Sequence, residues 1–231
     1  MCGDGVQYNR LMDPNATNSV INAVNLSTLW MTLIAGSIGG IIVLVFGKLY
    51  DWFSRKLTEP KLIVEFDKNI LGCITYTTTN DGRAAATVRI KATNYRGKRA
   101  ACGCTAYLTD VEMQNENGKF ESTGYCDSIR LAWSCQGLKP DRFGPMDIPR
   151  DVSQYIDIIS FLQHEAKFKP QLETTPNRYS LLFQQTGTFL FTAHVHAENA
   201  SPVKCKLIFT WRHPWDGSKD SNAFEALSYK D

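Results

Sequence analysis

Residues 188–212 read TFLFTAHVHAENASPVKCKLIFTWR and decide the fold. Apolar side chains take every second position in each half, first Phe189, Phe191, Ala193, Val195 and Ala197, then Val203, Cys205, Leu207, Phe209 and Trp211. Because successive side chains of a strand point to opposite faces, this period predicts two antiparallel strands with one buried face. For both apolar sets to face one core, residues of like parity must pair, for example Ala197 with Cys205. That register places His196 opposite Lys206 on the outer face.

Similar short runs recur upstream and are separated by turn residues. Seven further candidate strands precede the two strands above: 62–66, 73–78, 84–93, 102–113, 129–133, 155–161 and 179–183. Strands at this spacing, without an intervening helical period, predict an all-β fold of two packed antiparallel sheets. We expect one sandwich domain over residues 61–215, entered at Pro60, and a polar tail over 216–231.

The N-terminal part has a different pattern, because no formal charge occurs from residue 14 to residue 47. The centre, about 29–47, is almost wholly apolar, and Trp30 and Trp52 stand where interfacial aromatic residues belong. Asp13 and Pro14 form a good helix start. The sequence therefore predicts an exterior leader over 1–13 and a long helix over 14–57 that contains one transmembrane span.

Basic residues set the expected orientation of this span. Four of them follow it closely, Lys48, Arg55, Lys56 and Lys61, whereas only Arg10 precedes it. Lys and Arg favour the cytoplasmic side, so we expect a single-pass protein of the inner (cytoplasmic) membrane, with its N-terminus outside and its large domain cytoplasmic. The seven cysteines show no disulfide spacing and are expected to be reduced thiols.

The predicted helix collects polar and small residues on one side. The candidates for a pore or a helix interface are Asn18, Asn22, Asn25, Thr32, Gly36 and Gly40. Small residues at an interval of four let helices approach closely in lipid, which predicts a homo-oligomer. Two interpretations stay open: a dry helix contact, or a ring of copies around a water-filled path.

The segment best suited to bind a ligand is rich in basic residues. Residues 83–99 hold six basic side chains and no acid, against a net charge of +2 for the whole chain. Arg83, Arg89 and Lys91 have the outward parity of a strand, and the expected hairpin tip adds Tyr95, Arg96, Lys98 and Arg99. Such a surface could hold phosphates and stack a base, as in a nucleotide or oligonucleotide. The alternatives are a solvated hairpin face that protects a sheet edge, or a contact with lipid headgroups.

The sequence contains no motif that indicates an enzyme. Phosphate loops, nucleophile elbows and zinc-protease motifs are absent, and no carboxylate pair can be identified for acid–base work. His194 with His196, and Cys102 with Cys104, could each supply two zinc ligands, but the strand parity turns the histidines outward and the cysteines inward. We therefore expect no catalytic residues, no metal and no cofactor.

Some of these residues also carry a resemblance. The stretch KATNYRGKRAAC at 91–102, Trp133 and the turn Asp147-Ile148-Pro149 resemble the immunoglobulin-like domain of small bacterial single-span membrane proteins. The plan of leader, span and β-domain is similar to membrane effectors of bacterial anti-phage systems, in which a nucleotidyltransferase supplies the signal. It is nearest to the Hailong-type effector, which implies an oligomeric channel controlled by DNA oligomers.

Two functions from different classes follow. The first is a homo-oligomeric membrane effector that forms or gates an ion channel and whose cytoplasmic domain senses a nucleotide or oligonucleotide. The second is a membrane-tethered scaffold whose sandwich binds a cytoplasmic protein through a free strand edge.

Overall fold

The computed structural model describes residues 31, 43–54, 57–95, 99–136, 140–212 and 214–229. The chain divides into two units, Met1–Leu57 and Thr58–Asp231. In the first unit the described residues are helical at 31, 43–54 and 57. Within the part of the chain that the structure describes, none of the helices combines the length and apolarity needed to cross a membrane. Most of the predicted span, residues 32–42 included, lies outside the described residues.

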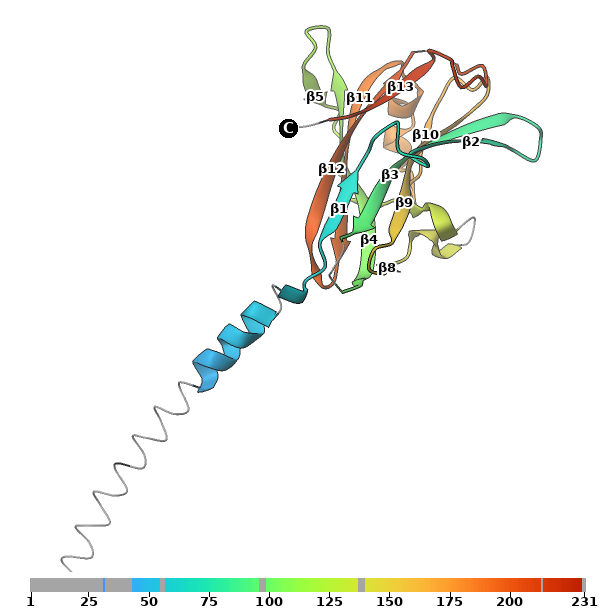
Figure 1. The fold of residues 1–231 in the computed structure, drawn as a ribbon. Helices are drawn as coiled ribbons and strands as arrows, with labels where there is room; N and C mark the ends of the chain where they lie inside the picture. The colour runs from blue at the N-terminus through green and yellow to red at the C-terminus, as the bar shows by residue number, and fades with distance from the viewer. Residues whose placement is uncertain are drawn as a thin grey trace, which may run out of the picture. The chain divides into compact units, whose positions relative to one another are not determined.

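The second unit is built mainly from β-strands in two sheets (Figure 1). The six-stranded sheet contains β1 (Leu62–Glu65), β2 (Ile74–Thr78), β3 (Ala84–Asn94), β7 (Ala132–Trp133), β9 (Ser153–Leu162) and β10 (Lys169–Pro170). The seven-stranded sheet contains β4 (Ala101–Gln114), β5 (Phe120–Ser122), β6 (Ile129–Arg130), β8 (Met146–Ile148), β11 (Gly187–Ala197), β12 (Ala200–Trp211) and β13 (Phe224–Ser228). Every pairing between these named strands is antiparallel, as the alternating sequence predicts.

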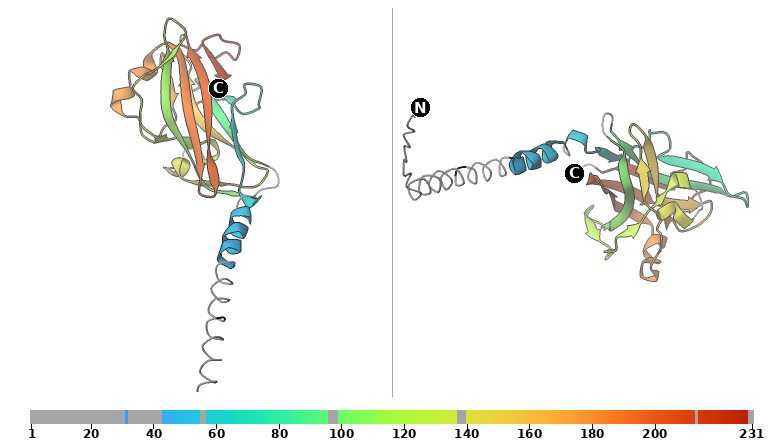
Figure 2. Two further views of the ribbon diagram at one scale, coloured as in Figure 1. Left: turned by 90° about the vertical axis from the view of Figure 1, so that its left-hand side faces the viewer. Right: turned by 90° about the horizontal axis from the view of Figure 1, so that it is seen from below.

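Short 3₁₀ turns connect some of the strands. They are η1 (Ser134–Gln136), η2 (Pro140–Phe143), η3 (Asn177–Tyr179) and η4 (Leu182–Gln184). In Figure 2 the strands of the seven-stranded sheet run side by side along one face of the unit.

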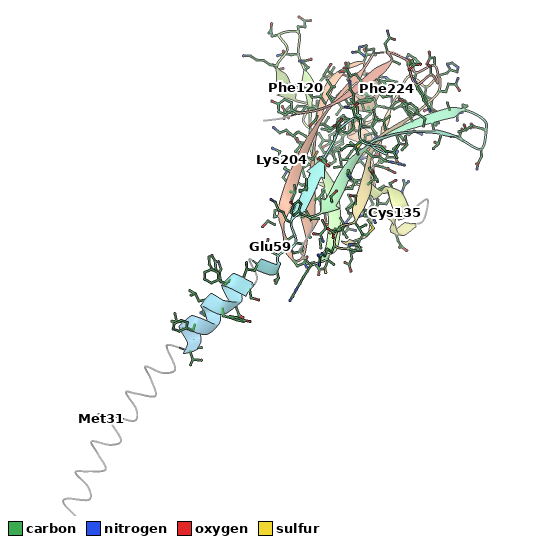
Figure 3. All side chains as sticks on the ribbon, in the orientation of Figure 1. Met31, Glu59, Phe120, Cys135, Lys204 and Phe224 are labelled. Carbon is green, nitrogen blue, oxygen red and sulfur yellow. The ribbon has the colours of Figure 1, made fainter. Side chains whose placement is uncertain are left out.

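Aromatic rings join the two sheets at the core. Phe161 of β9 lies 4.6 Å from Phe224 of β13 and 5.1 Å from Trp211 of β12, measured between ring centroids. Phe168, which precedes β10, lies 5.3 Å from Phe189 of β11. These side chains are all buried, and Figure 3 labels Phe224 among the side chains of this region. Because large aromatic side chains dominate core energetics, this cluster contributes strongly to the packing of the two sheets.

The structure confirms the buried faces predicted for residues 188–212 and corrects their register. Phe189, Val195 and Trp211 are fully buried, as the alternation requires. Residues of like parity do pair along most of the hairpin, but Cys205 lies opposite Ala193 rather than Ala197. The chain turns at 198–199, and the pairing shifts after Val195, so the loop is shorter than the one that pairing Ala197 with Cys205 would leave.

Two other predictions about elements are wrong. Residues 179–183, expected as a strand, contain the end of η3 and most of η4. Their apolar residues Tyr179 and Phe183 are buried through single 3₁₀ turns, which bury isolated side chains without strand alternation. The predicted polar tail at 216–231 contains β13, whose Phe224 and Ala226 are buried against the core. Its two inward residues are too few to stand out among polar neighbours.

Candidate functional site

The outer face of β3 carries an ion pair at its centre. Ala86, Val88 and Ile90 are buried, so the intervening side chains point away from the core, as predicted. Arg89 Nε lies 2.6 Å from Asp157 Oδ1 of β9, and the two side chains are only 21% and 16% exposed. Burial raises the pKa of Asp157, and the Arg89 charge opposes that rise. The positive charge of Arg89 is thus compensated within the fold.

Arg83, which directly precedes β3, is also paired with acids. It contacts Asp81 at 2.7 Å and Glu165 at 3.3 Å, in a solvent-exposed setting. Hydrogen bonds from Thr79 and Arg83 lower the pKa of Asp81 to about 2. The third outward residue, Lys91, stands opposite Glu65 of β1 in the strand register. The three cations predicted to bind a ligand along β3 therefore each have an acidic neighbour.

The predicted basic hairpin at residues 83–99 is wrong. Strand β3 pairs with β1, β2 and β9, whereas β4 belongs to the other sheet, so the two strands form no hairpin. The chain passes from one sheet to the other between the end of β3 at Asn94 and the start of β4 at Ala101, and we call this passage the crossing. The hairpin of this region lies instead between β2 and β3, and Figure 1 shows it extending away from the sheets. The ten steps from Ala84 to Asn94 cover roughly 33 Å. Arg83 and Tyr95 therefore lie at opposite ends of the strand and cannot share one small ligand.

A smaller cluster forms at the start of the crossing, and we call Lys61, Tyr95 and Arg99 the Tyr95 cluster. The Tyr95 ring is 51% exposed, and the Lys61 ammonium lies 5.7 Å from its centroid. Tyr95 N–H donates to the Lys61 carbonyl over 2.9 Å. Arg96 and Lys98, predicted at the same tip, lie outside the described residues.

Asn94 fixes the geometry of this crossing. Its side chain is fully buried, and its amide donates to the carbonyls of Arg99 (2.7 Å) and Ile148 (3.1 Å). The two ends of the crossing are therefore held together, which keeps Tyr95 and Arg99 close. Sequence reasoning missed Lys61 because its place beside Tyr95 depends on the pairing of β1 with β3, which adjacent residues do not reveal.

The histidine pair lies on the outer face of the seven-stranded sheet, as predicted. The rings of His194 and His196 are stacked with centroids 6.2 Å apart, and Tyr107 meets His196 edge-on at 5.8 Å. Burial lowers the pKa of His194, with smaller contributions from His196 and Lys204. The two imidazoles and the Tyr107 ring thus form an aromatic cluster on this face.

The cysteine pair departs from its predicted geometry. Cys104 is buried, but Cys102 is only partly so, because Gly103 between them has φ +59° and interrupts the strand alternation. A side chain at Gly103 would also meet the Glu198 carboxylate at 2.6 Å. Among the described residues, no three His, Cys, Asp or Glu side chains gather as a metal site would require.

The predicted pore or helix-interface residues, from Asn18 to Gly40, all lie outside the described residues. In the neighbouring described helix, Val43, Phe46 and Leu49 expose half or more of their surface. Exposed apolar side chains of this size mark a surface that another apolar phase or another protein can cover.

Comparisons with known proteins add little to this description. The chain matches no protein-family model, and no curated protein matches it. Among solved structures, it is similar to the X-ray structure of Northeast Structural Genomics Consortium target SoR45, at 11% sequence identity and a TM-score of 0.23. That likeness covers 63% of this chain and 79% of the other and carries no argument about fold or function.

Proposed function

We propose that this protein is a homo-oligomeric effector of the inner membrane that forms or gates an ion channel in anti-phage defence. Its cytoplasmic domain, proposed to be an immunoglobulin-like sandwich, senses a nucleotide or oligonucleotide from a partner nucleotidyltransferase. The N-terminal helices pack through Gly36 and Gly40 and place Asn22 and Asn25 along the ion path. No catalytic step is part of this function.

The Tyr95 cluster is the observation that carries the sensing role. The exposed Tyr95 lies beside the Lys61 ammonium, and Arg99, whose carbonyl is bound by Asn94, is close to it in the fold. A stacking surface next to positive charge is the combination that single-strand binders use. Arg83 and Arg89 drop out of the proposed contact surface, because acids compensate both of them. Arg96 and Lys98, which are close to Tyr95 in the sequence, would add positive charge to the contact with the ligand.

The sensing role is tested by oligonucleotide binding to full-length protein in detergent. Fluorescence anisotropy should show affinity for single-stranded DNA that falls with salt, and Arg99→Gln should reduce the log–log slope by about 0.7. Tyr95→Ala should cost about 1–3 kcal/mol of binding free energy, whereas Tyr95→Phe keeps the stacking surface and the affinity. Arg83→Gln is the matched control, because that arginine is paired at the far end of β3. Equal losses for Arg83→Gln and Arg99→Gln would place the ligand elsewhere.

Ion flux separates the effector from the scaffold. In reconstituted liposomes, the effector should conduct when the signal is present, and replacing Asn22 or Asn25 by Leu should abolish conduction while crosslinked oligomers persist. A scaffold with an inert span gives no flux under any condition. Loss of oligomers in Gly36→Leu or Gly40→Leu would support the helix contact in either case.

A further inference from the structure

A cavity with a basic rim lies well away from the Tyr95 cluster. It has a volume of about 340 Å³ and is bounded by β10, the segments on either side of it, and the turns η2 and η4. Lys169 of β10 pairs with Ser160 of β9, while the crossing that holds Tyr95 begins beside the Ser153 end of that strand. The seven steps between these serines cover roughly 23 Å, so the two sites are separate.

Three cations line this cavity, and its lining contains no acid. They are Arg142, Lys167 and Lys169. Both lysines are exposed, and within the described part of the chain neither makes an ion pair. The Arg142 guanidinium lies 4.7 Å from the Phe143 ring centroid, which holds the charge in place without neutralising it.

Three acids from the neighbouring segments are already engaged by other cations. Glu165 contacts Arg83 at 3.3 Å, Glu173 approaches Arg130 at 4.0 Å, and Asp157 holds Arg89 at 2.6 Å. The charge of Arg142 also acts on Asp157, but that carboxylate is already in contact with Arg89. The lining of the cavity therefore carries three positive charges and no carboxylate.

The walls beneath these charges are apolar. Phe168 and Phe183 line the cavity while remaining almost fully buried, with ring centroids 5.8 Å apart. Ser180 and Thr175 add hydroxyl groups to the lining. A hollow of this size, with an apolar wall and a few polar groups at one side, is typical of a small-molecule site.

We propose that this cavity binds a small phosphate monoester whose organic part is an aromatic or similarly compact apolar group. The phosphate lies between Lys167, Lys169 and Arg142, and the organic group rests against Phe168 and Phe183. A dianionic head suits the three cations better than a carboxylate, since a phosphate offers three acceptor oxygens and close to two charges at neutral pH. The site is independent of the proposed oligonucleotide surface and would give the domain a second input.

Phenyl phosphate is the test ligand, and full-length protein in detergent is titrated with it by calorimetry, with protein-free micelles as the blank. Phenyl phosphate should bind more tightly than inorganic phosphate, which lacks the ring, and than phenol, which lacks the charge. Binding should weaken at pH 5, where the monoester loses one negative charge. Lys167→Gln with Lys169→Gln should lower the affinity about tenfold.

The matched control is Lys68→Gln with Lys119→Gln, which removes two exposed lysines from turns outside the cavity. This control should bind phenyl phosphate as the wild type does. Near-ultraviolet circular dichroism verifies that both double variants are folded. Equal binding by the two double variants, equal binding of phenol and phenyl phosphate, or no binding of phenyl phosphate at millimolar concentration would overturn the proposal. The Lys167→Gln, Lys169→Gln variant should bind single-stranded DNA as the wild type does. Loss of phenyl phosphate binding in this variant can therefore be told apart from failure of the sensing role.

Discussion

The surroundings of Arg89 on the six-stranded sheet and of His194 on the seven-stranded sheet differ in how charges are arranged. On the six-stranded sheet, neighbouring strands place unlike charges together: Arg89 meets Asp157, and Lys91 stands opposite Glu65. On the seven-stranded sheet, His194 stands opposite Lys204 and stacks on His196. The centre of the first face is compensated across its strands, whereas the part of the second face around His194 gathers groups that are, or become, positive.

This difference teaches that the two faces respond differently to pH. Unlike charges in register stabilise a sheet wherever both are ionised, while like charges in register disfavour protonation. The compensated face should therefore be sensitive to the loss of a partner, and the histidine face should be sensitive to acid. Three predictions address this contrast.

The largest effect is expected from Asp157→Asn. It leaves the Arg89 guanidinium largely buried without its counter-charge, and because both groups keep some solvent contact we expect a loss of about 2–3 kcal/mol in the free energy of unfolding. Urea unfolding of full-length protein, followed by near-ultraviolet circular dichroism, measures this loss. Asp81→Asn removes the partner of an exposed arginine and should change nothing measurable. Similar effects at the two sites would remove the distinction between a buried and an exposed pair.

A smaller effect is expected when the pH falls. The pKa of His194 is lower in the folded state than in the unfolded chain, so in the window below about 6.5 the unfolded state binds more protons. Stability contributed by neutral His194 is therefore present above that window and lost as pH falls through it. Thermal unfolding between pH 5 and pH 7.5 should show a shallower decline in His194→Gln than in wild type. Parallel curves for the two proteins would show that His194 does not contribute to acid sensitivity.

The smallest effect is expected from Glu65→Gln. Its carboxylate stands opposite Lys91 at an exposed edge position, where a cross-strand pair contributes less than about 0.5 kcal/mol. The urea midpoint should shift slightly, and the shift should disappear in high salt. Glu116→Gln, in the exposed β4–β5 turn, provides the baseline for removing one negative charge. A loss as large as that of Asp157→Asn would mean that burial does not set the strength of these pairs.

The sequence predicts the β-rich fold and its buried faces because alternation acts locally. Phe189, Val195 and Trp211 are placed in the core by their own strand neighbours. The register between β11 and β12 is harder to predict from the sequence. Parity determines which face of each strand is buried, but it does not determine the length of the loop between the strands. Strand β13 is missed because Phe224 and Ala226 give too short a pattern, and their burial depends on β12.

The binding surfaces depend on contacts between distant residues, so sequence reasoning recovers less of them. Tyr95 and Arg99 are identified from composition, but the compensation of Arg89 by Asp157 brings together residues 68 positions apart. Glu165 is paired with Arg83, and Glu173 lies near Arg130, and the sequence reveals neither contact. These contacts engage two acids that are close in the chain to the cavity lysines. A cluster of positive residues in sequence is thus a poor measure of net charge in space.

The first part of β12, before Leu207, has a further consequence. Strand β13 pairs with Leu207–Trp211 only, so the outer edge of the preceding residues lies beyond its reach. There Pro202 has no N–H to donate, the Ser201 N–H is taken by Glu59 Oε1 at 2.9 Å, and Lys204 is exposed. An oligomeric ring would hold many copies of this edge at high local concentration, the condition under which open strands join into intermolecular sheets. In the proposed oligomer, a blunted edge would let the domains lie close together without aggregating. It also makes this strand a poor place for a partner protein to add a strand of its own.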